Sequence, residues 1–114
     1  MAERECVFCR IPREQGAQHL YKDEKVYVIR DIHPRAPVHL LIIPLEHLTS
    51  PTDQEPSQVP VMGQMFVVAQ EMARREGVAL SGYRLIVNQG PDSGQEVQHI
   101  HMHLLAGRRL VAMG

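Results

Sequence analysis

Alternating apolar and polar residues over 19–32 predict the first regular structure of this chain. The alternation centres on Val26, Val28 and Ile32 and is typical of extended strands. The charged stretch KDEK at residues 22–25 separates two short alternating runs and has the composition of a turn. We therefore predict a β-hairpin over this segment.

A nearly continuous apolar run, VHLLIIP at residues 38–44, follows the predicted hairpin. Pro34 and Pro37 break the chain before it, and Pro44 ends it. Uninterrupted β-branched and aliphatic residues over this length are typical of a central strand. We expect this strand to be buried on both faces.

Residues 57–78 change to the period of a helix. Apolar side chains recur every three or four positions. Ser57 is the predicted N-cap, and Gly77 the residue that follows the C-cap. The pattern predicts one long helix whose buried face consists of Val59, Met62, Phe66, Ala69 and Ala73.

The last third of the chain predicts two more strands. YRLIVNQG at residues 83–90 and VQHIHMHLLAG at residues 97–107 flank a glycine-containing loop, PDSGQE. Strands followed by one helix and further strands indicate an α+β domain with a mostly antiparallel sheet. At 114 residues, the chain has the length of a single domain, residues 1–114.

The charge balance limits the partners. The formal net charge is −1 and the pI is near 6.6, so no global positive field attracts nucleic acid or an acidic membrane. No apolar stretch approaches the roughly 20 residues of a membrane span, and the first residues have no secretion-signal pattern. We expect a soluble protein of the cytoplasm.

Three histidines occupy alternate positions in the sequence HIHMH. On a strand, His99, His101 and His103 would share one face about 7 Å apart, and the intervening apolar residues would share the other. Three imidazoles on one wall are typical of a catalytic metal site. They are equally suited to a histidine nucleophile with supporting neighbours. The spacing leaves both possibilities open.

The same stretch, HIHMHLL, matches at every position the motif His-φ-His-φ-His-φ-φ, with φ apolar, of the histidine triad (HIT) family. RDIHPRAPVHLLIIPLEH, GYRLIVN and GQEVQHIHMHLLAGR also resemble successive blocks of its Hint branch. The resemblance runs from CVFCRI to Arg108. It implies a HIT fold, with a five-stranded, mostly antiparallel sheet, one long helix and a short N-terminal helix, and it implies a homodimer.

The resemblance also implies an activity. Family members hydrolyse purine nucleoside phosphoramidates through a covalent nucleotidyl-histidine, and His101 matches the attacking residue. His103 would support the phosphate, His39 would orient the site, and no catalytic metal is expected. A dinucleoside polyphosphate or nucleotide-sulfate hydrolase, or a nucleotide-binding regulatory module, is the alternative.

The matching positions further imply the nucleotide contacts. Asp31 corresponds to the ribose-binding acid. Glu96 stands where many members have serine, and it acts through its backbone N–H, binds an amine leaving group, or is only a solvated loop residue. His19 and His33 match no site position and are expected at the surface. The purine pocket would contain Phe8, Ile11, Ile29, Ile32 and Leu41, and the phosphate contacts would come from Asn88, Gly94, Gln95, Glu96 and Val97.

Cys6 and Cys9 have the Cys-x-x-Cys spacing that lets two thiolates reach one metal ion. The spacing alone also fits a redox pair or two small buried residues. In a subset of the family, such a pair binds structural zinc with two histidines. The resemblance assigns His47 and His99 as those ligands.

Overall fold

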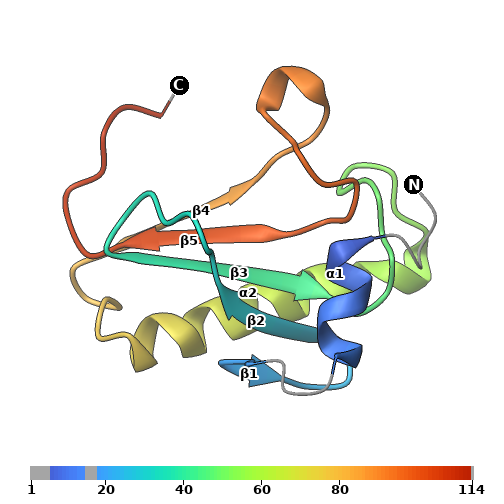
Figure 1. The fold of residues 1–114 in the computed structure, drawn as a ribbon, viewed down its shortest axis with the longest axis horizontal. Coiled ribbons are helices and arrows are strands. Elements are labelled where there is room, and N and C mark those ends of the chain that lie inside the picture. Colours follow the sequence, from blue (N-terminus) through green and yellow to red (C-terminus); the bar gives the residue numbers. More distant parts are fainter. Residues whose placement is uncertain (1–5, 15–17, 114) are drawn as a thin grey trace.

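A five-stranded antiparallel sheet forms the framework of the molecule, in the spatial order β1-β2-β3-β5-β4 (Figure 1). The computed structural model describes residues 6–14 and 18–113. Every neighbouring pair of strands runs antiparallel, which confirms the predicted α+β class. The strands are β1 (Tyr21–Lys22), β2 (Val26–Arg30), β3 (Val38–Pro44), β4 (Tyr83–Val87) and β5 (Met102–Ala106).

Two α-helices of different length lie on opposite faces of this sheet (Figure 1). The short helix α1 (Val7–Arg10) continues into the 3-10 turn η2 (Ile11–Arg13). The long helix α2 (Val59–Arg75) follows the 3-10 turn η3 (Pro56–Gln58), and a last such turn, η4 (Pro91–Ser93), precedes β5. Within the described residues, no helix has the length and apolar character needed to cross a bilayer.

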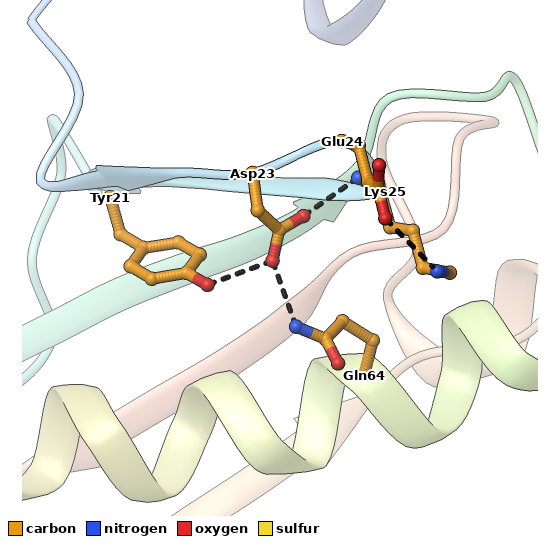
Figure 2. A pocket seen from close by; sticks show the side chains of 5 residues that line it. All are labelled: Tyr21, Asp23, Glu24, Lys25 and Gln64. Carbon is orange, nitrogen blue, oxygen red and sulfur yellow. Dashed lines mark hydrogen bonds and ion pairs between the residues drawn. The ribbon is translucent and has the colours of Figure 1, made fainter.

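The predicted hairpin is confirmed, and the carboxylate of Asp23 organises its turn (Figure 2). Its Oδ1 accepts hydrogen bonds from the backbone N–H groups of Lys25 and Val26, at 2.7 and 2.8 Å. Its Oδ2 accepts from the Tyr21 hydroxyl and the Gln64 amide, both at 2.8 Å. A hollow of about 430 Å³ lies beside these residues. Both oxygens of the Asp23 carboxylate in it already accept hydrogen bonds, so the role of this carboxylate is structural.

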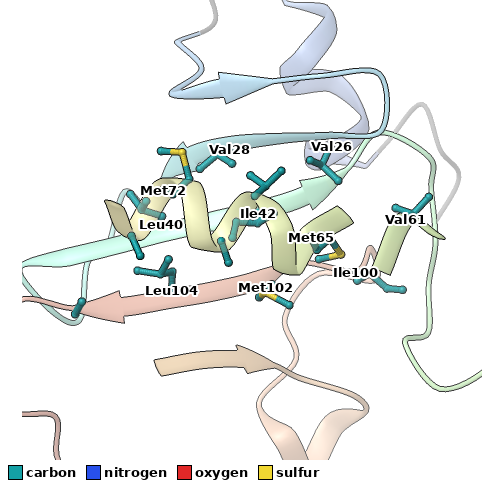
Figure 3. Close-up of a cluster of buried hydrophobic side chains, with 14 of the residues drawn as sticks. Val26, Val28, Leu40, Ile42, Val61, Met65, Met72, Ile100, Met102 and Leu104 are labelled. Atoms are coloured by element: carbon teal, nitrogen blue, oxygen red, sulfur yellow. The ribbon is translucent and has the colours of Figure 1, made fainter. Parts of the chain in front are cut away.

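The main core lies between the sheet and α2 (Figure 3). Alternate side chains of β2, β3 and β5 point toward the helix, as the period of an extended strand requires. β3 is buried along nearly its whole length, as predicted for a central strand. The largest core side chains on this face include Leu40, Ile42, Met65, Met72, Ile100, Met102 and Leu104.

The buried face of α2 differs from the predicted one. Val59 and Phe66 were expected in the core but are 56% and 53% exposed. Ala69 and Ala73 are buried as predicted, and Met62 packs partly buried against the core. Helix α2 is apolar around more than one side, however, and periodicity alone cannot choose which side is fully buried. The buried residues are Val61, Met65, Val68, Ala69, Met72 and Ala73.

The start of the long helix also differs from the prediction. Ser57 lies inside η3 and does not cap α2. Glu55 caps the turn instead, through a capping box in which its side chain and that of Gln58 bond reciprocally to backbone N–H groups. At the other end, Gly77 follows the C-cap with a φ of 74°, which confirms its predicted position.

The last strand is shorter than predicted, since β5 begins at Met102 and not at residue 97. Before it, the N–H of Ile100 donates to the carbonyl of Leu48 at 2.6 Å, so this backbone group pairs outside the sheet. The alternation of faces nevertheless extends upstream. Ile100 joins the core under α2, whereas His99 and His101 face the other side, where α1 lies.

Candidate active site and metal centre

A cleft of about 600 Å³ opens on the face of the sheet opposite α2. Among the predicted nucleotide contacts, only Gln95 is not part of its lining. The side chain of Gln95 accepts from the N–H of Gly90 at 2.8 Å and donates to the carbonyl of Val97 at 3.2 Å, so it braces the loop. The predicted residues that line the cleft are Phe8, Ile11, Ile29, Asp31, Ile32, Leu41, Asn88, Gly94, Glu96, Val97, His101 and His103.

The register of the sheet places His103 beside the apolar floor of this cleft. Ile29 pairs with Leu41, Leu41 pairs with His103, and His103 pairs with Ile86. Residues directly opposite one another in antiparallel strands share a face. One row across the strands therefore carries an imidazole next to two aliphatic side chains, which suits a phosphate beside an apolar base.

The hydrogen bond of His101 determines which of its nitrogens can react. Its Nδ1 lies 2.8 Å from the carbonyl oxygen of His99. A carbonyl oxygen only accepts, so Nδ1 carries the proton and Nε2 holds a lone pair. The Phe8 ring packs edge-on against His101, with centroids 5.0 Å apart, and the imidazole is only 9% exposed. The ring of His101 is thus fixed in orientation, and its neutral form has one nucleophilic nitrogen, Nε2.

A second chain of hydrogen bonds fixes His39 and His103. The backbone N–H of Arg35 donates to Nδ1 of His39 at 3.0 Å, so the proton of a neutral His39 must lie on Nε2. That Nε2–H lies 2.9 Å from Nδ1 of His103 and 3.3 Å from the Asp31 carboxylate. His103 accepts there and consequently carries its own proton on Nε2, where it can donate to an anion.

His39 and His103, the two imidazoles joined by these hydrogen bonds, are uncharged at neutral pH. Burial, followed by the nearby His101 and His39, lowers the pKa of His103 to about 4. Burial also lowers the pKa of His39, although the Asp31 carboxylate acts in the opposite direction. A histidine is neutral at a pH above its pKa, and both pKa values are lowered. The neutral tautomers described above are therefore the relevant ones at pH 7.

Asp31, His39 and His103 place three possible ligand atoms within 4.8 Å of one another, but they do not suit a metal ion. A metal would need the lone pair of His39 Nε2, which the hydrogen bond from Arg35 denies. Histidines that bind metals normally donate a proton from their other nitrogen, whereas His39 accepts there. The cluster is therefore a hydrogen-bond relay. His99 lies in a different cluster, so the three triad histidines do not form one metal site.

Cys6, Cys9, His47 and His99 form that other cluster. All four ligand atoms lie within 4.8 Å of one another, and the contacts of Nδ1 of His47 and His99 with each other and with the cysteine sulfurs include distances of 3.1 to 3.5 Å. Cys9 Sγ to His47 Nδ1 is 3.1 Å, and Cys6 Sγ to His99 Nδ1 is 3.4 Å. Tetrahedral zinc with ordinary bond lengths separates its nitrogen and sulfur ligands by about 3.3 to 3.8 Å. Two thiolates and two imidazoles in this arrangement fit a closed, structural zinc site.

The tautomer of His99 suits this role. Its Nε2 lies 2.8 Å from the carbonyl oxygen of Pro44, so Nε2 carries the proton and Nδ1 offers its lone pair toward the cysteines. This is the outer-shell arrangement expected of a metal-binding histidine, and the opposite of the one at His39. Cys6 and His99 are completely buried, and Cys9 is 3% exposed.

The metal cluster and the cleft share one wall. Phe8 lies between the two cysteines in sequence, and its ring packs edge-on against both His99 and His101. The buried Tyr27 hydroxyl donates to the carbonyl of Phe8 at 2.6 Å, which ties α1 to the sheet. The cluster therefore holds in place the helix that supplies an apolar wall of the cleft.

Several cleft residues were missed in the sequence. Of these, His33 and Arg35 lie between Asp31 and His39, which were both predicted to belong to the site. Their place between two predicted site residues was the feature of the sequence that could have indicated them. His33 is exposed, as expected, but it lines the cleft, whereas His19 is half-buried against the Tyr27 ring rather than on the surface. The cleft residues that the sequence did not indicate are Val7, Arg30, His33, Arg35 and Ser93.

Comparisons with known proteins agree with this geometry. The family model described as HIT domain matches residues 12–110. The purine nucleoside phosphoramidase of Escherichia coli (strain K12) is 46% identical over 114 residues, which cover 99% of this chain and 95% of that protein. A histidine triad protein from Clostridium difficile superposes with a TM-score of 0.91 at 35% identity, covering 100% of both chains. A zinc-bound histidine triad family protein from Mycobacterium smegmatis gives a TM-score of 0.75 at 32% identity, covering 94% of this chain and 78% of that one.

Proposed function

Because the chain belongs to the histidine triad family, we propose that it is a cytoplasmic hydrolase of purine nucleoside phosphoramidates, of the adenosine 5′-monophosphoramidate type, formed by a single HIT domain over residues 1–114. The observation that carries this proposal is the lone pair of His101 Nε2, fixed at the cleft by the bond from Nδ1 to the His99 carbonyl. A hydrolase in the same family, nearly half identical along almost the whole chain, supports it.

The reaction proceeds in two displacements at the α-phosphorus. His101 Nε2 attacks phosphorus, the bond from phosphorus to the amine nitrogen breaks, and the amine leaves after taking up a proton. Water then attacks the nucleotidyl-histidine, the bond between phosphorus and Nε2 breaks, and the nucleoside monophosphate is released. Overall, the hydroxyl of one water ends on phosphorus and its remaining proton on the amine.

The relay of Asp31, His39 and His103 supports the phosphate during both steps. His103 presents its Nε2–H on the same face as His101, with ring centroids 5.1 Å apart. A preorganised donor aimed at developing negative charge lowers the barrier more than a mobile one. Asp31 also accepts from the N–H of His33 at 2.8 Å, which orients its carboxylate for the ribose hydroxyls.

The phosphate also meets the loop before β5. The Asn88 amide donates to the carbonyl of Ser93 at 2.7 Å, which closes the loop around η4. Gly94 adopts a left-handed φ of 85°, so the loop can turn tightly there and direct backbone N–H groups at an anion. Glu96, an exposed side chain on this loop, contributes its backbone N–H rather than its like-charged carboxylate.

Turnover of matched substrates tests the proposed function. We expect the protein to release AMP from adenosine 5′-monophosphoramidate much faster than from a diadenosine polyphosphate, measured by chromatography under the same conditions. Faster cleavage of the polyphosphate or of a nucleotide sulfate would indicate the alternative hydrolase. Binding of nucleotides without turnover of any of these substrates would indicate a regulatory module and overturn the proposal.

A homodimer is the proposed assembly, and two surface features support it. β4 forms an edge of the sheet, and exposed edge strands are normally covered in native proteins. The exposed stripe of α2 is apolar and contains Val59, Gly63 and Phe66. Gly63 costs the helix about 1 kcal/mol relative to alanine, and no atom lies near its missing side chain. A glycine on this stripe would let a second copy approach closely.

Phe66→Glu should therefore weaken the dimer, because it places a charge in the proposed apolar interface. We expect sedimentation equilibrium to give twice the chain mass of 12.9 kDa for the parent protein and a shift toward the monomer for the variant. Thr52→Glu, which adds the same charge in an exposed loop, is the control. A parent protein that sediments as a monomer contradicts the proposed assembly.

A further inference from the structure

Arg35 is a cleft residue for which the reaction proposed above has no use. It lies on the loop of residues 31–37, which connects β2 to β3, and its side chain is exposed in the lining of the cleft. Arg30 also lines the cleft, but its guanidinium is held by both oxygens of Glu76 at 2.9 and 3.0 Å. Among the residues that the structure describes, no carboxylate pairs with the guanidinium of Arg35. One arginine of the cleft is therefore committed, and the other is available to a ligand.

The backbone of Arg35 is fixed at both of its polar groups. Its N–H donates to His39 Nδ1 at 3.0 Å, and its carbonyl accepts from the Arg108 guanidinium at 2.9 Å. Gly107 adds to this clamp, since a Cβ at Gly107 would lie 2.8 Å from Pro37 and so only glycine permits the close approach. The loop thus holds the backbone of Arg35 in one position relative to the relay of Asp31, His39 and His103. Its long side chain lines the cleft.

The positive charge of Arg35 reaches the reaction centre. Burial is the main reason that the pKa values of His39 and His103 are lowered, and the charge of Arg35 lowers both further. The charge therefore acts at the atoms that surround the α-phosphate. An arginine in this position can bind a planar or tetrahedral oxyanion through two parallel N–H bonds.

The ribose and base have their own contacts in the cleft, at Asp31 and along the apolar wall, so the group that remains for Arg35 is the leaving group. We propose that Arg35 determines leaving-group specificity by binding an oxyanion on the group expelled from the α-phosphorus. This inference rests on the proposed function and names its substrate class: nucleoside phosphoramidates whose leaving amine carries a carboxylate or a phosphate. Arg35 binds this part of the substrate and takes no part in the bond changes at phosphorus.

A matched substrate pair tests the inference. The adenosine 5′-phosphoramidates of glycine and of glycinamide differ only in carboxylate against carboxamide. The quantity measured is the ratio of their kcat/KM values, because the intrinsic reactivity of the two amines is the same for every variant. We expect Arg35→Gln to lower this ratio about tenfold, the effect of one charge-assisted contact at a partly exposed site. Arg35→Lys keeps the charge but loses the two parallel N–H donors of the guanidinium, so it should retain part of the preference.

Two controls separate a specific contact from a general change. Lys25→Gln removes the same charge at the opposite end of β2 and should leave the ratio unchanged. Raising the salt concentration should reduce the preference of the parent protein but not that of Arg35→Gln, since an exposed ionic contact is screened. A parallel comparison with a diadenosine polyphosphate shows whether the variant loses more on the carboxylate or on the phosphate, and so identifies the oxyanion.

The possible failures are distinguishable. If the parent protein turns over neither of these phosphoramidates nor adenosine 5′-monophosphoramidate, the proposed function is wrong. If it turns over only adenosine 5′-monophosphoramidate, the proposed function stands and the role of Arg35 is overturned. If it turns over both members of the matched pair, and Arg35→Gln leaves the carboxylate-to-carboxamide and polyphosphate preferences unchanged, the proposed function stands and the role of Arg35 is overturned.

Discussion

His101→Ala should reduce the release of AMP from adenosine 5′-monophosphoramidate by at least about a thousandfold, since removal of a covalent nucleophile leaves only binding and charge stabilisation. The lone pair of Nε2 has no substitute within reach, because His103 has its proton on Nε2 and points Nδ1 at His39. Steady-state turnover of the parent and the variant, with AMP measured by chromatography, gives the ratio directly.

The same variant should keep its nucleotide site. The proposed ribose and base contacts come from other residues, so the Kd for AMP, measured by calorimetry, should change by no more than a few-fold. His19→Asn removes an imidazole that is half-buried against Tyr27 and is the matched control, with turnover near that of the parent. Rapid quenching of the parent should also trap a nucleotidyl adduct on His101. Full activity in His101→Ala, or an adduct on another residue, would refute the mechanism.

Loss of the metal should be the largest effect on stability. Cys9→Ser removes the sulfur that lies 3.1 Å from His47 Nδ1 and 3.5 Å from His99 Nδ1. Zinc binding to a set of two thiolates and two imidazoles is worth about 10 kcal/mol or more in small zinc domains. We expect Cys9→Ser, purified without chelator, to contain no stoichiometric zinc and to unfold at a Tm lower by more than about 10 °C.

A chelator separates the effect of the metal from that of the substitution. EDTA should lower the Tm of the parent protein toward that of Cys9→Ser, and it should leave Cys9→Ser itself unchanged. His47→Asn should behave like Cys9→Ser, whereas His19→Asn should retain the metal. Because Phe8 stands between the two cysteines and lines the cleft, the KM for the nucleotide should rise when zinc is lost. A parent protein without zinc, or one whose Tm EDTA does not change, would contradict the assignment.

Local patterns in the sequence were sufficient for most of the fold. The hairpin, the central strand, the long helix and its final glycine depend on side-chain period and turn chemistry, which neighbouring residues determine. The errors arose where two local solutions were equally good. α2 has two apolar stripes, and only packing against the sheet decided that Met65 is buried and Phe66 exposed. In the same way, the first residues of the predicted last strand have the right alternation, but Ile100 pairs with Leu48 and not with a strand.

The sequence predicted which residues line the cleft better than it predicted what each of them can do. Alternation placed His99, His101 and His103 on one face, and the resemblance indicated most residues of the cleft. Neither showed Arg35 as a cleft residue, because its exposure to the cleft depends on how the loop of residues 31–37 is clamped by Arg108 and Gly107. Exposed charged residues in loops carry no periodic signal, so only the folded chain distinguishes this arginine from the others.

The sequence by itself determined that three imidazoles share a face, that two thiols are spaced for one metal ion, and that an apolar sheet with one long helix supports them. Only the tertiary structure decided what each imidazole can do. A histidine offers a lone pair on one nitrogen when its other nitrogen donates, and the partners of those nitrogens are distant in sequence or belong to the backbone. The Pro44 carbonyl leaves His99 Nδ1 facing the cysteines, the His99 carbonyl leaves the lone pair of His101 Nε2 available at the cleft, and the Arg35 N–H makes His39 a donor to His103.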